Sequence, residues 1–349
     1  MDISHYIGFD VHKKWIFYCV KTNDGTIVEE GKVEATRAGL RSWAQRQGEA
    51  WVGGLEATLF SGWIYDELKP YAAELKVANP AMLKAIAASK KKNDRIDARK
   101  IADTLRCNLF PECYMAPSRI RELRRMLRYR SLVVTQAVRL KNRIAGLLME
   151  QGIRYDERRL HGKRYFAELL KSLKTPATTW QLLRLSRASL EMFQAVERRL
   201  IGELERNPAL RTRVRLLQTI RGVGPILALT WALEVAEVGR FSSIRKAVSY
   251  CGLCSAERES GGKRVRGPIS KQRNRHLQTI LVEAAKVAPR WNPELAALHE
   301  RELARGNRNR ATLAVARKLV AYLMAVDRSG QAFQPRGSVS ETAGAAAAD

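Results

Sequence analysis

Four carboxylates within the first hundred residues have the residue types and the spacing of a metal site. Asp10 and Glu56 each end an apolar run with the composition of a strand, and Asp94 and Asp97 stand three residues apart, so that on a helix they would share one face. Such acids repel one another in a partly dry site unless a divalent cation is bound, and hard oxygen ligands suit Mg²⁺ or Mn²⁺. Two such ions can activate an attacking oxygen and stabilise a leaving oxygen on phosphorus.

Each acid taken alone has a more ordinary explanation. An Asp at a strand end or near a helix start commonly caps backbone N–H groups or faces solvent. The ordered set and its basic surroundings favour the metal site, because the chain from Lys84 to Arg143 has 17 Lys and Arg against 5 Asp and Glu. Basic side chains attract phosphate, so we expect nucleic-acid contacts close to the acids. The candidates are Lys13, Lys14, Arg95 and Arg99.

A serine in the last third of the chain is the second chemical candidate. Ser260 precedes Gly261 and Gly262, and the sequence predicts a pliable loop there, on which the backbone can approach a ligand closely. Basic residues around it could hold a phosphate and stabilise the charge that develops in its transfer. They are Arg258, Lys263, Arg264, Arg266, Lys271 and Arg273. No Ser-His-Asp spacing is present, and from the residues alone a loop that only binds phosphate is the stronger interpretation.

The overall charge indicates the class of partner. The 349 residues include 62 Lys and Arg against 35 Asp and Glu, which gives a net charge of +27 and a pI near 10.3. Release of counterions from neutralised phosphates drives binding to DNA or RNA whatever their sequence. The charge therefore favours a nucleic-acid partner over a merely well-solvated surface, and it carries no information about the fold.

Membrane and disulfide classes are not indicated. No run reaches the about 18 apolar residues that a membrane helix needs, and the N-terminus lacks a basic segment followed by an apolar one, so we expect no membrane contact and a cytoplasmic location. Five cysteines, an odd number, do not predict a disulfide framework. Cys251 and Cys254 form the one CxxC, and without a second pair a zinc site is disfavoured.

Hydrophobic periodicity changes along the chain. Up to Pro80, strand signals alternate with helix signals, which predicts an α/β sheet of about five strands, the first three antiparallel. Strand signals almost vanish afterwards. From Pro117 to about Asn207, apolar residues recur at three-and-four spacing, as in long antiparallel helices or a coiled coil. Gly222 and Gly224 then separate two apolar helical runs, which fits either a phosphate-binding helix-hairpin-helix or a plain turn in a bundle.

The same signals predict four segments. Residues 1–112 form the α/β domain with the acids, 113–208 the helical coiled-coil segment, and 209–330 a C-terminal domain with the helix-hairpin-helix and the serine loop. Residues 331–349, rich in Gly, Ser, Pro and Ala, have no apolar period and form a disordered tail.

Five short motifs, in their order along the chain, resemble the insertion-sequence transposases of the DEDD/serine class, which are relatives of the Piv DNA invertases. Each motif is weak alone, but the ordered set is specific, and the resemblance covers nearly the whole chain to about Val326. They are Gly-Phe-Asp-Val-His-Lys from residue 8, Gly-Leu-Glu-Ala-Thr from 54, Lys-Asn-Asp-Arg-Ile-Asp-Ala from 92, Gly-Val-Gly-Pro from 222, and Cys-Gly-Leu with Glu-Ser-Gly-Gly-Lys-Arg from 251 and 259.

The resemblance implies a fold and a set of roles. It implies a RuvC-like (RNase H-like) α/β N-terminal domain, followed by mainly α-helical coiled-coil and C-terminal transposase domains. Asp10, Glu56, Asp94 and Asp97 would be the metal-binding tetrad. Ser260 would be the nucleophile, because the family's serine directly precedes glycine, although Ser255 and Ser270 lie nearby.

The resemblance also implies partners. It implies a homodimer to homotetramer whose active sites are shared between protomers. It further implies guidance by a structured bridge RNA, which pairs with donor DNA through one loop and with target DNA through another. Specificity carried by base pairing leaves little trace in side chains, so the sequence does not give the guide RNA, the donor and target sequences or the order of strand exchange.

Three functions follow as hypotheses. The first is an RNA-guided, Mg²⁺-dependent transposase or site-specific recombinase that cleaves and rejoins donor and target DNA through a phosphoserine at Ser260. The second is a RuvC-like nuclease that hydrolyses branched DNA with water and does not need Ser260. The third is a non-enzymatic, basic nucleic-acid-binding protein, for which the charge and the long helices suffice.

Overall fold

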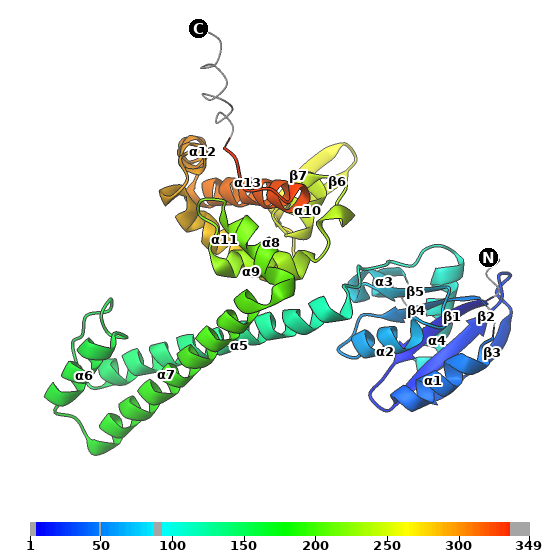
Figure 1. Ribbon diagram of the computed structural model, residues 1–349, viewed down its shortest axis with the longest axis horizontal. Coiled ribbons are helices and arrows are strands. Elements are labelled where there is room, and N and C mark those ends of the chain that lie inside the picture. The colour runs from blue at the N-terminus through cyan, green and yellow to red at the C-terminus, as the bar shows by residue number, and fades with distance from the viewer. Residues whose placement is uncertain (1–4, 49, 87–92, 336–349) are drawn as a thin grey trace, which may run out of the picture. The chain divides into compact units, whose positions relative to one another are not determined.

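The computed structural model describes residues 5–48, 50–86 and 93–335. It divides into two compact units, Met1–Ser118 and Arg119–Asp349 (Figure 1). The elements of the first unit are β1 (His5–Val11), β2 (Trp15–Lys21), β3 (Ile27–Glu34), α1 (Arg37–Arg46), β4 (Trp51–Glu56), α2 (Ser61–Leu68), β5 (Glu74–Ala78), α3 (Pro80–Ile86) and α4 (Asp94–Arg106).

The elements that follow are helical except for one hairpin. They are α5 (Ser118–Glu150), α6 (Lys163–Ser172), α7 (Ala177–Arg206), α8 (Pro208–Gln218), α9 (Pro225–Val235), η1 (Val238–Arg240), α10 (Ile244–Tyr250), β6 (Ser255–Ser260), β7 (Lys263–Ile269), α11 (Arg275–Val287), η2 (Ala288–Arg290), α12 (Pro293–Ala304) and α13 (Arg308–Ser329).

A five-stranded sheet in the order β3-β2-β1-β4-β5 forms the centre of the first unit. The first three strands are antiparallel, whereas β4 runs parallel to β1 and to β5. This confirms the predicted sheet and the antiparallel pairing of its first three strands. Because β1 and β4 are neighbours, their carboxyl ends lie at the same edge of the sheet.

Side chains alternate between the two faces of this sheet. On β1, Ile7 and Phe9 are fully buried in a core with α1 and α2, in which Phe9 meets Trp43 edge-on at 5.2 Å between ring centroids. Gly8 lies on the opposite face, against α4. Asp10 has the same parity along the strand as Gly8, so it too is directed to the face that α4 covers.

Gly8 allows α4 to approach the sheet closely. A Cβ atom at Gly8 would lie 2.1 Å from the carbonyl oxygen of Ala98 and 2.5 Å from the amide nitrogen of Ala102. Both alanines are fully buried, so neither offers a flexible side chain that could move aside. The close packing therefore fixes α4, and the acids in its first turn, against β1.

We expect Gly8→Ala to lower the free energy of unfolding by about 1–3 kcal/mol, because backbone atoms of α4 would have to move. Gly146→Ala is the matched control. A Cβ at that position in α5 meets nothing within 4 Å, and the better helix former should raise stability by about 0.5–1 kcal/mol. Urea denaturation compares the two variants, and a Gly8→Ala protein as stable as the wild type would contradict the packing described.

Long helices begin the second unit, as their apolar spacing predicted. The helices α5 and α7 pack through a buried cluster that includes Ile144, Leu148, Leu183 and Leu190, together with Phe166 of α6. A larger core surrounds α9, in which every residue from 227 to 235 is buried. The coiled-coil geometry of the long helices stays a prediction.

A buried ionic network joins α9 to α5 and α11 within this unit. The carboxylate of Glu234 is fully buried and accepts two hydrogen bonds of 2.9 Å from Arg128 and one of 2.9 Å from Asn274, while Arg124 lies 3.7 Å away. Burial alone would raise the pKa of Glu234, but the hydrogen bonds and charges of these partners outweigh it and lower the pKa. The carboxylate is thus held ionised and ties three helices together.

Residues 255–269 form a β-hairpin, so the expectation of a pliable loop around Ser260 is wrong. The strands β6 and β7 are antiparallel, and Ser260 pairs with Lys263 across a two-residue turn. Gly261 and Gly262 in that turn have φ values of 55° and 74°, as a type I′ turn requires. Gly-Gly between two short segments is itself a hairpin signal, so the expectation of almost no strands after Pro80 is wrong at this hairpin.

The unit boundary after Ser118 lies near the predicted domain boundary at residue 112. The further division at residue 208 stays a prediction, and the predicted tail, 331–349, lies outside the described residues from position 336 onward. Among the described parts of the chain, no helix combines the length and the apolar character needed to cross a membrane.

Candidate active site

The carboxyl ends of β1 and β4 carry two of the predicted acids on one face of the sheet. Phe9 pairs with Leu55, and the next residues on the two strands are Asp10 and Glu56. Gly54, two residues before Glu56, faces the side chains of Leu105 in α4 and of Phe110. By strand alternation, Glu56 is therefore directed to the α4 face, as Asp10 is.

The other two predicted acids lie in the first turn of α4. This helix begins where it does because Asn93 caps it, accepting a hydrogen bond of 3.0 Å from the amide of Arg95. Asp94 and Asp97 are the two acidic residues of this first turn. Since α4 packs on the sheet face that carries Asp10, the fold brings both strands and this helix start to one place.

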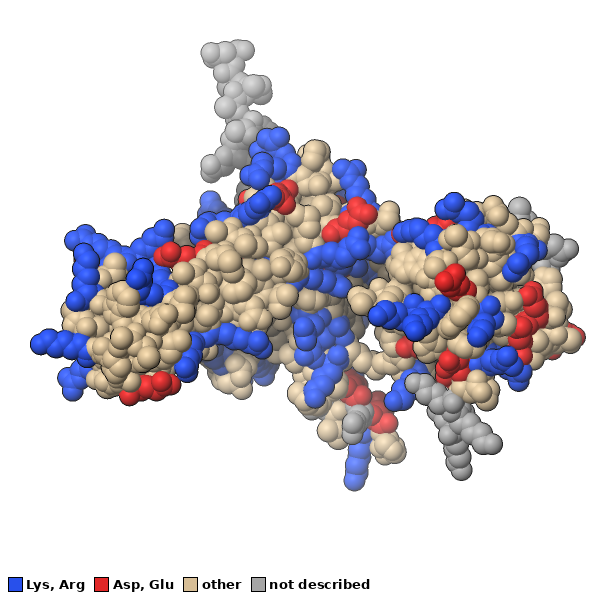
Figure 2. All heavy atoms as spheres, turned by 90° about the horizontal axis from the view of Figure 1, so that it is seen from below, with Lys and Arg blue, Asp and Glu red and all other residues tan. Residues whose placement is uncertain are grey.

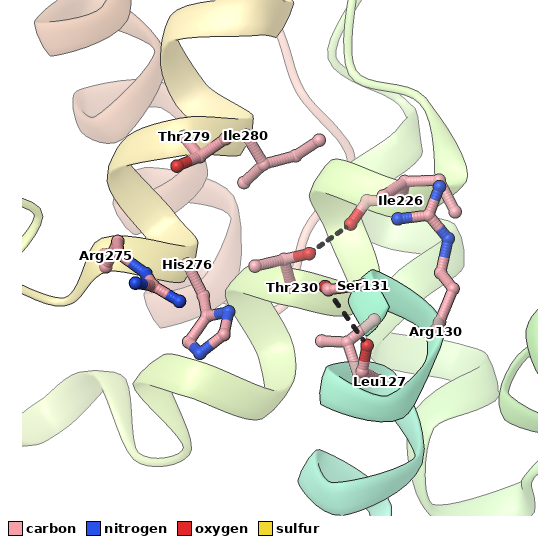
Figure 3. Close-up of a pocket in the computed structure, with 9 residues that line it drawn as sticks. All are labelled: Leu127, Arg130, Ser131, Ile226, Thr230, Arg275, His276, Thr279 and Ile280. Carbon is pink, nitrogen blue, oxygen red and sulfur yellow. Dashed lines mark hydrogen bonds between the residues drawn. The ribbon is translucent and has the colours of Figure 1, made fainter. Parts of the chain in front are cut away.

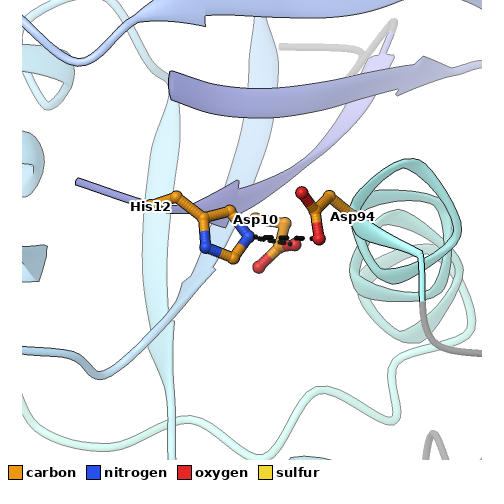
Figure 4. Close-up of side chains that lie close together, drawn as sticks. All are labelled: Asp10, His12 and Asp94. Carbon is orange, nitrogen blue, oxygen red and sulfur yellow. Dashed lines mark hydrogen bonds and ion pairs between the residues drawn. The ribbon is translucent and has the colours of Figure 1, made fainter. Parts of the chain in front are cut away.

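Three side chains come together there (Figure 4). The Nε2 atom of His12 lies 3.0 Å from Oδ2 of Asp10 and 3.4 Å from Oδ1 of Asp94. One ligand atom from each of the three residues lies within 4.8 Å of the other two. The imidazole thus stands between two carboxylates that would otherwise repel each other.

Glu56 and Asp97 are not members of this close group. Asp97 contacts Lys100 at 3.6 Å and still influences Asp10 through its charge. Glu56 is partly buried at the end of β4. Of the four predicted acids, Asp10 and Asp94 therefore both contact His12. The other two, Glu56 and Asp97, lie at the same edge of the sheet.

The electrostatics of Asp10 indicate why a cation would fit. Burial raises the pKa of Asp10, the hydrogen bond and charge of His12 lower it, and the charges of Asp94 and Asp97 raise it again, with a net increase. The side chain is only 17% exposed, so water screens the repulsion poorly. A divalent cation would remove the cost of holding these acids ionised.

Ser260 is exposed as the last residue of β6, directly before the hairpin turn. Ser255 is the first residue of the same strand and is also exposed, so the two serines lie at opposite ends of β6. Ser270 follows β7 and accepts a hydrogen bond of 3.1 Å from the amide of Gln272. The hairpin and the acid cluster belong to different compact units.

Several of the predicted nucleic-acid contacts are available on the surface. Lys13, Lys14 and Arg95 near the acids, and Lys263 and Lys271 near the serine, are exposed. Figure 2 shows the general setting, with Lys and Arg side chains much more frequent than acidic ones on the visible face.

The remaining predicted contacts are engaged within the chain or lie outside the described side chains. Arg99 forms a two-pronged pair with Glu30, and Arg264 pairs with Glu257 across the hairpin. Arg273 donates a hydrogen bond of 2.9 Å to the carbonyl oxygen of Ser270. Nothing is described of the side chains of Arg258 and Arg266, which were predicted to bind phosphate.

Two protein families match separate parts of the chain. Residues 7–152 match a transposase family of the DEDD type named for IS110. Residues 214–300 match the family described as transposase IS116/IS110/IS902.

Individual relatives agree with these matches. A Sinorhizobium fredii protein, y4qE, whose name assigns it to the transposases, is 27% identical over 80% of this chain and 70% of its own length. The transposase for insertion sequence element IS1328 of Yersinia enterocolitica is 26% identical over 74% of this chain and 78% of its own. The transposase for IS1111A of Coxiella burnetii is 28% identical over 67% and 66%.

The chain belongs to the IS110/IS116 transposases. The two matched ranges of this transposase contain all four predicted acids and Ser260. A transposase of the DEDD type depends on a divalent metal, and the donor set at the sheet edge fits one. Carboxylate oxygens are the ligands that Mg²⁺ and Mn²⁺ prefer, and the close group supplies them from Asp10 and Asp94.

His12 is the member of the transposase's acid cluster that sequence reasoning missed. A weak signal was present, because His12 follows Asp10 by two residues, directly after β1 ends at Val11. A second signal, its contact with Asp94, depends on the packing of α4 and cannot be read from spacing.

The raised pKa of Asp10 predicts an unusual pH dependence for the metal-free transposase. An acid whose pKa is raised by folding stabilises the folded state below its unfolded-state pKa, and this contribution is lost as the pH rises through the folded-state pKa. Asp10→Asn should therefore raise the melting temperature in a chelator at neutral pH, with a gain that shrinks as the pH falls toward 4.

Added Mg²⁺, in contrast, should stabilise the wild type more than Asp10→Asn. It should stabilise the wild type by about 2.7 kcal/mol at about 100 times its Kd, and Asp10→Asn much less. Asp24→Asn is the control, because hydrogen bonds from Thr22 and Thr26 lower the pKa of that exposed acid to about 2, so its removal should not stabilise the protein. Equal Mg²⁺ responses in the wild type and Asp10→Asn would contradict a metal site at Asp10.

Proposed function

We propose that this transposase cleaves and rejoins donor and target DNA through a covalent phosphoserine at Ser260, assisted by a divalent metal held by Asp10, Glu56, Asp94 and Asp97. The observation that carries the proposal is the packing of α4 on β1, which gathers acids at one sheet edge in a chain of the IS110/IS116 family. The non-enzymatic alternative is set aside, because the relatives are named as transposases, which are DNA-cleaving and rejoining enzymes.

The proposed first step is a transesterification. The Oγ atom of Ser260 bonds to a DNA phosphorus, the bond from that phosphorus to the leaving deoxyribose oxygen breaks, and the serine proton ends on the leaving oxygen. The phosphodiester energy is kept in the phosphoserine, so a free DNA hydroxyl can reverse the reaction on another strand and rejoin it. An exposed serine at the tip of a basic hairpin suits a large DNA substrate.

The acids would contribute to this step through the divalent metal that they hold. Asp10, Asp94, Asp97 and Glu56 would hold the divalent cation, Mg²⁺ or Mn²⁺, with His12 able to complete or support the set. When bound, such ions supply stabilisation for the attacking and leaving oxygens. The exposed Lys13, Lys14 and Arg95 next to the acids would hold the DNA backbone in place.

We further propose that a structured guide RNA selects donor and target by base pairing, and that the active assembly is a homodimer to homotetramer. The net charge of +27 supports a chain that neutralises an RNA as well as two DNAs. The acids and Ser260 lie in different compact units, which is compatible with active sites completed between protomers.

Purification of the full chain from its host, followed by sequencing of the RNA that co-purifies, tests the guide. One discrete RNA transcribed next to the gene is the expected result. Recovery of bulk ribosomal and transfer RNA alone, in the proportions found with any basic protein, would contradict RNA guidance and leave the transposase activity itself untouched.

A RuvC-like nuclease that hydrolyses DNA with water is the second candidate. It is favoured by one observation, namely that all four acids lie in one compact unit and need no residue of the hairpin. The two candidates differ at Ser260, since the nuclease should cleave without it and the recombinase should not.

A further inference from the structure

A pocket in the second unit takes no part in the proposed chemistry. It has a volume of about 230 Å³ and lies among α5, α9 and α11, all within residues 119–349 (Figure 3). That volume suits one small ring-bearing ligand rather than a nucleic-acid helix. Its lining combines apolar, hydroxyl and basic side chains, and each kind limits what could bind.

The apolar part of the lining comes from three different helices. Leu127 of α5 is buried, while Ile226 of α9 and Ile280 of α11 are partly buried. Aliphatic side chains from separate helices offer apolar surface against which the face of a flat ring can be placed. A purely inorganic anion would make no use of this surface.

The basic part of the lining retains unused donors. Arg275 is exposed, and among the described residues it has no hydrogen bond or ion pair. Arg130 donates one hydrogen bond of 2.6 Å to Glu197, but its Nε atom is buried without a partner in the described part of the chain. The Arg130 Nε atom is too deeply buried for a ligand to reach, so the acceptor oxygens of a ligand would be held by the guanidinium of Arg275.

His276 and Thr230 can form hydrogen bonds with the polar edge of a ligand. Burial, with the charges of Arg128, Arg275 and Arg124, lowers the pKa of His276 against the opposing effect of Glu234. At neutral pH the imidazole is therefore uncharged and offers one donor and one acceptor. Beside it, the hydroxyl of Thr230 donates to the carbonyl oxygen of Ile226 at 2.7 Å and can still accept a hydrogen bond.

The buried network described above explains why this pocket is preformed. Asn274, the cap of α11, is bonded to Glu234 of α9, and Glu234 is bonded to Arg128 of α5. The three helices that line the pocket are thus tied together one residue away from Arg275. Because these helices are already held in place, a ligand would bind without the entropic cost of ordering them.

We propose that this pocket binds a single unpaired nucleotide of a nucleic-acid strand, with the base against Leu127, Ile226 and Ile280 and the phosphate at Arg275. The inference rests on the proposed function, because it takes a nucleic acid as the substrate. Bases that are splayed out of a strand are commonly held between side chains in this way, and the nucleotide could come from an RNA or from a locally unpaired DNA.

Binding of short fluorescent oligonucleotides to the full-length protein tests the proposal. The probes are single-stranded oligoadenylate as RNA, the same sequence as DNA, and a DNA duplex of equal length. Arg275→Gln removes the charge, and Ser131→Phe fills the pocket. Each variant should weaken single-strand binding about tenfold and duplex binding less than about twofold. The RNA and DNA arms show which strand supplies the nucleotide.

Arg301→Gln in α12, the same charge loss outside the pocket, is the matched control and should leave both kinds of binding within about twofold. Wild-type single-strand binding in Arg275→Gln would overturn the proposal, and so would equal losses for single strand and duplex. Arg275 is exposed, so its variant remains informative even where Ser131→Phe fails to fold. Ser260→Ala should bind every probe normally, which separates this test from a failure of the proposed chemistry.

Discussion

Replacement of Asp10 by asparagine is expected to lower the rate of DNA strand cleavage by about 10³-fold, because the acid cluster loses the carboxylate on which its other members converge. The carboxylate of Asp10 lies 3.0 Å from His12, and the charges of Asp94 and Asp97 both raise its pKa. Asparagine keeps the size and removes the charge. Cleavage of DNA that carries the element's ends, in Mg²⁺, measures the effect.

The control distinguishes catalysis from binding. Asp24→Asn makes the same change in an exposed turn of the same unit and should cleave at the wild-type rate. DNA affinity of Asp10→Asn should be unchanged or slightly higher, since a negative charge near phosphate has been removed. A variant that keeps its cleavage rate within about tenfold would show that Asp10 holds no essential metal.

Replacement of Ser260 by alanine is expected to abolish the covalent protein–DNA adduct altogether, because alanine has no atom that can bond to phosphorus. Denaturing gel electrophoresis after reaction with labelled DNA detects the adduct. Ser255→Ala, at the other end of the same strand, is the matched control and should form adduct normally. Both serines are exposed on β6, so each variant removes one exposed hydroxyl from the same strand.

The same pair of variants decides between the two candidate activities. A hydrolytic nuclease would cleave DNA equally well with Ser260→Ala and would leave free ends without any adduct. Cleavage by Ser260→Ala at the wild-type rate, combined with the loss of cleavage in Asp10→Asn, would therefore favour the nuclease over the recombinase.

The sequence predicted the first unit well because its signals are local. Strand signals that alternate with helix signals up to Pro80 predicted about five strands, and the structure has five, β1 to β5. Asp10 and Glu56 were predicted at the ends of two strands, and the structure places them near the carboxyl ends of the parallel neighbours β1 and β4. The long helices α5 and α7 likewise followed from periodicity.

The features that were missed depend on tertiary contacts or on short, weak signals. The hairpin at Ser260 has charged residues on both strands, so its Gly-Gly turn was the only sequence signal that predicted it. His12 acquires its role from α4, more than eighty residues away in the sequence. The burial of Glu234 with Arg128 and the pocket beside it require three helices to meet, and no spacing along one helix predicts that.

The most direct test of the central claim is to map the DNA-linked residue in the adduct by tryptic digestion and mass spectrometry. Trypsin separates the three candidate serines, because Ser260 lies in the peptide Glu259–Lys263, Ser255 in Ala247–Arg258 and Ser270 in Gly267–Lys271. The account predicts a nucleotide on Glu259–Lys263 alone. A nucleotide on either other peptide, or no linked peptide from DNA that has been cleaved, would contradict it.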